Sequence, residues 1–123
     1  MTGEAETNPD KVCNLGYLAE MMGHKAHLIK GILDTFLTQV PEELRCINEA
    51  VEKSEYDVIR RYAHTMKSSV SILGIAALAP ILKEMESLSV KEEKMDEIRG
   101  LCQKLNVLCE QAIAEIEIEK QNY

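Results

Sequence analysis

His64 is the residue of this sequence best placed for nucleophilic chemistry. Lys67 follows it by three residues and Ser68 by four, and on a helix both positions lie beside His64 on the surface. Ser68 is small enough to leave the imidazole uncovered, and the mobile ammonium of Lys67 can meet an anionic group carried on the ring. A nearby cation also disfavours the imidazolium form. These neighbours predict a ring nitrogen that is free to act as a nucleophile near neutral pH.

The segment around His64 has the periodicity of a helix with one apolar face. At about 100° per residue, its apolar side chains fall on one side, and they are Ile59, Tyr62, Ala63, Met66, Val70 and Leu73. His64 points roughly 140° away from the centre of that side. The polar residues around it are Asp57, Arg60, Lys67, Ser68 and Ser71. The pattern therefore predicts that His64 is exposed and does not belong to the core.

Apolar residues recur at intervals of three and four in five segments. This spacing predicts helices over residues 12–22, 25–53, 56–73, 75–88 and 94–120. Pro41 interrupts the second segment, so we expect a kink or break near Val40, and Gly23 and Gly74 fit helix ends. No alternating run rich in Val, Thr and Tyr predicts a strand. Short connections favour antiparallel neighbours, so the expected fold class is all-α, an antiparallel four-helix bundle with a short extra N-terminal helix.

Composition narrows the class of protein. Residues 1–10, which read MTGEAETNPD, are predicted to be a disordered leader, and residues 11–120 a single domain. The net charge of −7 argues against nucleic-acid binding, because phosphate backbones are bound by clustered Lys and Arg. No apolar run approaches the roughly 18–20 residues of a membrane span, and the leader fits neither a signal nor a transit peptide.

The four scattered cysteines have no CxxC spacing. We expect reduced thiols, no membrane contact by this segment and a cytoplasmic location.

The residues from Ala63 to Gly74 resemble a known motif. Ala63, His64 and Lys67, followed by Gly74, are similar to the A-H-x-x-K pattern and following glycine of histidine phosphotransfer (HPt) domains of bacterial two-component phosphorelays. The resemblance covers most of the chain, because further residues also fit the family's spacing: Phe36, Pro41, Asp57, Ala77, Leu78 and Glu86. One position departs from the family, which usually has glycine directly after the lysine, where this chain has Ser68.

The resemblance implies a phosphorelay intermediate. His64 would attack an aspartyl phosphate on a receiver domain of a response regulator through Nε2, and then pass the phosphoryl group to an aspartate on a second receiver. Lys67 would offset charge on the phosphoryl group, and Gly74 would end the histidine helix. The chain itself would need no cofactor, because Mg²⁺ belongs to the receiver. We expect a monomeric phosphocarrier without autokinase activity, either free-standing or part of a hybrid histidine kinase.

The same resemblance suggests which surface residues meet the receiver. Docking surfaces in the family lie around the histidine, which points to Arg60, Arg61, Ser68 and Ser71 in this chain. The two arginines would meet acidic groups at the receiver's phosphorylation pocket. The short first helix is a further candidate for this surface.

The sequence argues against one related class of domain and leaves two alternatives open, a metal-binding bundle and a helical adaptor. The phosphoacceptor domain of a histidine kinase typically has an acidic residue directly after the histidine and a proline a few residues on, and Thr65 and Ser69 stand there in this chain. A metal-binding bundle could use His24 and His27, which are three residues apart. A helical adaptor without chemistry would need no reactive histidine.

Overall fold

The computed structural model describes residues 12–123, and the predicted leader lies outside the described residues. The described part consists of five helices, and it contains no strand. Their bounds are α2 Leu15–Met21, α3 Ala26–Glu52, α4 Tyr56–Ile72, α5 Leu78–Lys91 and α6 Met95–Lys120. The prediction of an all-α fold is therefore confirmed.

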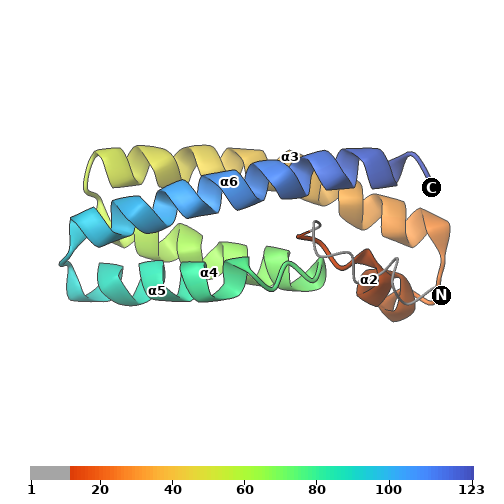
Figure 1. Cartoon of the computed structure of the whole chain (residues 1–123), viewed down its shortest axis with the longest axis horizontal. Helices are drawn as coiled ribbons and strands as arrows, with labels where there is room; N and C mark the ends of the chain where they lie inside the picture. The colour runs from red at the N-terminus through yellow and green to blue at the C-terminus, as the bar shows by residue number, and fades with distance from the viewer. Residues whose placement is uncertain (1–11) are drawn as a thin grey trace.

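Four long helices form the bundle, and α2 lies at one end of it (Figure 1). Helix α4 packs against α3 and α5, and α6 packs against the same two helices, so the four close into a ring. Apolar side chains from all five helices fill the interior, among them Leu18, Leu33, Ile59, Leu82 and Ile98, each with none of its surface exposed. The ring gives α4 one face toward the core and one face toward solvent.

Two predicted helix starts are wrong by three residues. Helix α2 begins at Leu15 and not at residue 12, because the Asn14 side chain accepts a hydrogen bond from the backbone N–H of Tyr17 and caps the helix there. Helix α5 begins at Leu78 and not at residue 75, because the chain turns through Gly74 first, with φ of +63°. Pro80 therefore lies in the first turn of α5, where its missing N–H has no helical acceptor.

Pro41 does not break α3, which continues from Ala26 to Glu52. Proline has no N–H, so the carbonyl group one turn before Pro41 lacks its helical hydrogen bond. Pro41 is exposed, so water can bind that carbonyl group instead. Val40 and Ile47 are fully buried before and after the proline. Their packing holds both parts of the helix against the bundle. Of the predicted kink or break, the break does not occur.

The intervals of three and four residues predict that the apolar stripe of α3 starts at Leu28 and runs through Ile32 and Phe36, and the structure differs from this prediction at its start. Steps of four residues from Phe36 back to Leu28 drift by about 40° each, because the helix repeats every 3.6 residues. Leu28 is consequently 40% exposed, whereas Ile29 and Leu33 are buried. Leu28 is left as an apolar residue on the surface.

None of the four cysteines forms a disulfide, and all of them lie within the described residues. Burial raises the pKa of Cys102 to about 11 and, as the main cause, the pKa of Cys109 to about 12. Both thiols therefore stay protonated at neutral pH and behave as small apolar side chains of α6. Within residues 12–123, no helix is long and apolar enough to cross a membrane.

Candidate functional site

Helix α4 presents His64 on its outer side. The neighbouring Ala63 and Met66 are fully buried, so the helix cannot rotate without exposing them. The His64 side chain is 71% exposed. The exposure predicted from the periodicity is what the structure shows.

Glu86 of α5 joins His64 and Lys67 of α4. One carboxylate oxygen, Oε2, lies 2.9 Å from Nδ1 of His64, and the other, Oε1, lies 2.5 Å from Nζ of Lys67. The Glu86 side chain is 23% exposed, so it lies between the two helices. The hydrogen bond from Lys67 is the main cause that lowers the pKa of Glu86, and the hydrogen bond from His64 adds to it. Glu86 is therefore ionised at neutral pH.

The carboxylate decides which ring nitrogen of His64 is reactive. An ionised carboxylate only accepts hydrogen bonds, so Nδ1 must carry the proton that it donates to Glu86. In the neutral imidazole the lone pair then lies on Nε2. Within residues 12–123 no group hydrogen-bonds Nε2. The site thus presents an exposed ring with an oriented, unshared lone pair, which is what a nucleophile requires.

Glu86 is the residue whose role the sequence did not reveal. Its spacing after Gly74 fitted the family, but nothing on α4 indicates which residue of α5 will face His64. The sequence predicted Lys67 as a lone cation beside the ring, whereas its ammonium is bound to Glu86 and the ring has a carboxylate neighbour. The lone pair on Nε2 therefore follows from the hydrogen bond between Nδ1 and Glu86 and not from the charge of Lys67.

A hollow of about 570 Å³ lies beside His64. Its lining residues are Asp57, Arg60, Arg61, His64, Thr65 and Glu86. Arg60 lies 3.9 Å from the carboxylate of Asp57, and the guanidinium of Arg61 lies 5.6 Å from the centre of the Tyr62 ring. The structure therefore brings both predicted arginines to the histidine. Of the other predicted docking residues, Ser68 and Ser71 are exposed on α4 but do not line this hollow.

Gly74 lies at a close approach of two chain segments. Its φ is +63°, a conformation that side chains rarely adopt. A Cβ atom at this position would lie 2.8 Å from Cβ of Asn14 and 2.9 Å from its carbonyl oxygen. Glycine is thus required for two reasons: the turn after α4 and the packing of the segment that enters α2.

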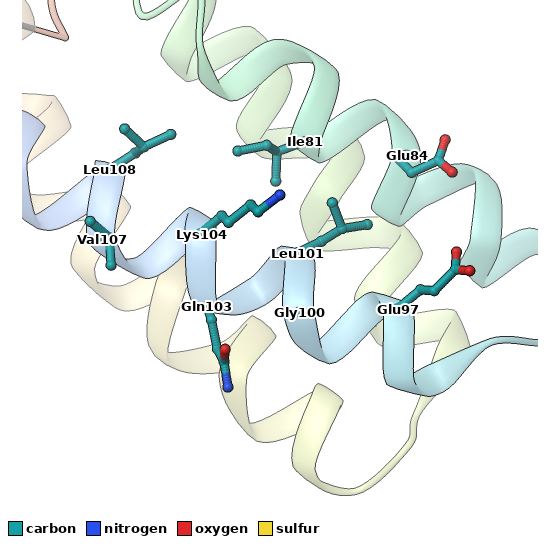
Figure 2. Close-up of a pocket in the computed structure, with 9 residues that line it drawn as sticks. All are labelled: Ile81, Glu84, Glu97, Gly100, Leu101, Gln103, Lys104, Val107 and Leu108. Atoms are coloured by element: carbon teal, nitrogen blue, oxygen red, sulfur yellow. The ribbon is translucent and has the colours of Figure 1, made fainter.

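A second hollow, of about 810 Å³, lies between α5 and α6 and does not include His64 (Figure 2). Ile81, Leu101 and Leu108 supply apolar side chains to it, while Lys104 points across it. Glu84 and Glu97 lie at one end of it. No residue of the His64–Lys67–Glu86 cluster lines this groove.

The two other histidines are surface residues at the start of α3. His24 precedes the helix with φ of +59°, and His27 lies in its first turn; both are exposed. In the described range 12–123, no three His, Cys, Asp or Glu residues are grouped so that they could hold a metal ion. The metal-binding alternative therefore has no donor set in that range.

Comparison with known proteins identifies the class. A helical bundle that displays an exposed histidine with an adjacent lysine has the arrangement of a phosphotransfer domain. The Hpt domain family model matches residues 24–117, and the chain belongs to this family. The chain is therefore a phosphotransfer protein of the two-component type, and proteins of this family are phosphocarriers that interact with receiver domains.

One solved structure supports the fold. Histidine-containing phosphotransfer protein B (HptB) from Pseudomonas aeruginosa PAO1 is similar to this chain, with a TM-score of 0.83 at 23% sequence identity. The match covers 93% of this chain and 98% of that chain. At this identity the likeness shows the shared helical bundle. No curated protein sequence matches the chain significantly.

Proposed function

We propose that His64 accepts a phosphoryl group from the aspartyl phosphate of one receiver domain and passes it to the aspartate of another. The observation that carries this proposal is the geometry at the ring. Glu86 engages Nδ1, and Nε2 has no partner among residues 12–123, on a side chain that is 71% exposed. A receiver can therefore bring its phosphoryl group to Nε2 without displacing any of these residues.

In the transfer, the lone pair on Nε2 attacks phosphorus and forms the N–P bond. The P–O bond of the acyl phosphate breaks, and its electron pair leaves with the receiver's carboxylate. The ring acquires positive charge in this step, which the Glu86 carboxylate at Nδ1 stabilises. Lys67 offsets charge on the phosphoryl group, and Mg²⁺ is supplied by the receiver. Passage to the second receiver is the reverse of this step.

An apolar strip of surface suits the docking of a receiver. Ile72 is 41% exposed and lies two turns after His64, within about 80° of it around α4. Three further apolar side chains are at least 40% exposed: Leu28 on α3, and Tyr17 and Met21 on α2. A groove of about 170 Å³ between α3 and α4 includes Ile72. We define this set, Tyr17, Met21, Leu28 and Ile72, as the docking strip.

Phosphoryl transfer to His64 tests the proposal directly. A receiver domain charged with acetyl phosphate in the presence of Mg²⁺ is mixed with the wild type, with His64→Gln and with the control His27→Gln, which replaces another exposed histidine. We expect acid-labile label on the wild type and the control, and none on His64→Gln. Equal labelling of His64→Gln would contradict the proposal.

The same assay separates the alternatives. We propose a cytoplasmic monomer without autokinase activity, so ATP alone should leave the protein unlabelled, and label on His64 from ATP would overturn that part. If the protein were an adaptor without phosphotransfer chemistry, the wild type would bind the receiver but would remain unlabelled. That result would favour the adaptor over the phosphocarrier.

A further inference from the structure

The short helix α2 is attached to the bundle through backbone groups that precede it. The N–H groups of Val12 and Cys13 donate to the two carboxylate oxygens of Glu115 on α6, at 2.8 and 3.0 Å. The next residue, Asn14, donates its N–H to the carbonyl oxygen of Leu73 at 3.1 Å. Three consecutive backbone donors are thus bound by the ends of α4 and α6.

These contacts provide a constraint that the helix itself lacks. A helix of seven residues is marginal in isolation. Leu18 is the buried side chain of α2, and Leu15, Ala19 and Met22 pack partly against the core beside it. These apolar contacts fix how deeply α2 sits, whereas the hydrogen bonds of the preceding backbone fix the direction from which the chain enters it. The carboxylate of Glu115 accepts hydrogen bonds from two successive N–H groups. Charge-assisted hydrogen bonds of this kind are stronger than hydrogen bonds between neutral groups.

We propose that Glu115 is a positioning residue for receiver docking. By binding the backbone of Val12 and Cys13 it fixes α2, and α2 carries Tyr17 and Met21 of the docking strip. This inference rests on the proposed function, because it assumes that a receiver binds the strip. Glu115 makes no contact with the His64–Lys67–Glu86 cluster, so its effect is on recognition and not on the reactivity of the ring.

The test separates recognition from chemistry. The variants are Glu115→Gln, which keeps one carbonyl acceptor, and Glu115→Ala, which keeps none. The control is Glu117→Gln, which alters an exposed carboxylate on the same helix. Two phosphodonors are used: the charged receiver domain that labels the wild type, over a range of concentrations, and phosphoramidate, a small molecule that reaches His64 without docking.

We expect Glu115→Ala to raise the half-saturating receiver concentration by roughly fivefold, with a smaller rise for Glu115→Gln. The rate at saturating receiver and the labelling by phosphoramidate should stay at the wild-type level in both variants and in the control. Wild-type half-saturation in both Glu115 variants would overturn the inference alone. An equal loss with both donors would overturn it as well, since that result indicates general damage to the fold. A wild type that neither donor labels would instead refute the proposed function.

Discussion

Two polar junctions join neighbouring helices of this bundle, and they differ in charge and exposure. Between α3 and α6, the side-chain amides of Asn48 and Asn106 donate to each other at 2.8 and 2.9 Å. The Asn48 amide also donates to the carbonyl oxygen of Leu44, and the thiol of Cys102 donates to Asn48 at 3.4 Å. This junction is neutral and half-buried, and the two amides bind each other in both directions.

The junction between α4 and α5 has the opposite character. It consists of the charged pair Lys67–Glu86 and the exposed ring of His64, whose Nε2 has no hydrogen-bond partner in the described part of the chain. A polar contact across two helices therefore has two different uses in this bundle. The reciprocal neutral pair helps to fix the register of α3 on α6, whereas the charged cluster, with one unshared lone pair, keeps a reactive group available.

Of the variants that compare the two junctions, Lys67→Ala should show the largest change in the rate of phosphoryl transfer. Removal of this ammonium should slow phosphoryl transfer by about 10- to 100-fold, because the charge on the phosphoryl group loses its partner. The variant should fold normally, since the Lys67–Glu86 pair lies at the surface. Rapid-quench measurement of transfer from a charged receiver checks this, with Lys83→Ala on α5 as the control. Wild-type transfer rates in Lys67→Ala would show that Lys67 has no role in the reaction.

Asn48→Ala should lower the stability of the fold but leave the rate of phosphoryl transfer unchanged. It leaves the half-buried amide of Asn106 without its partner, which should lower the free energy of unfolding by about 2 kcal/mol. Phosphoryl transfer should stay at the wild-type rate. Urea unfolding of both single variants and of the double variant Asn48→Ala/Asn106→Ala provides the measurement. The double variant should lose less stability than the sum of the single losses, and simple additivity would contradict the pairing.

Glu86→Gln should have the smallest effect. It keeps the size of the side chain but removes the charge, so transfer should slow by about three- to tenfold as the ring loses its anionic partner. Because the pKa of Glu86 is lowered in the fold, mainly by Lys67, its contribution to stability is present above the ordinary pKa. That contribution is lost as the pH falls through the lowered value.

The pH dependence of Tm tests whether the charge of Glu86 stabilises the fold. The wild type should melt slightly above Glu86→Gln near pH 6, and the difference should vanish as the pH falls through the lowered pKa of Glu86. Glu84→Gln, which removes an exposed carboxylate of the same helix, should show no such convergence. A difference that grows with acid would mean that the charge of Glu86 does not stabilise the fold.

Much of the fold follows from local spacing. The apolar positions around His64 predicted its exposure, and Gly23 and Gly74, both with positive φ, fall just beyond the ends of α2 and α4 as expected. The errors occurred where a capping side chain, a drift of the stripe or tertiary packing overrides the pattern. Asn14 delays α2, Leu28 rotates off the core, and packing on both sides of Pro41 carries α3 through it.

The spacing of apolar residues along the sequence is enough to place His64 on the outer face of a helix, with Lys67 one turn away. That result depends only on the repeat of 3.6 residues, which is the same in every α-helix. The tertiary structure decided that Glu86 meets both side chains, and with it which ring nitrogen is free. That contact depends on the register and packing of α5 against α4, which arise from the core as a whole and are not encoded in either helix alone.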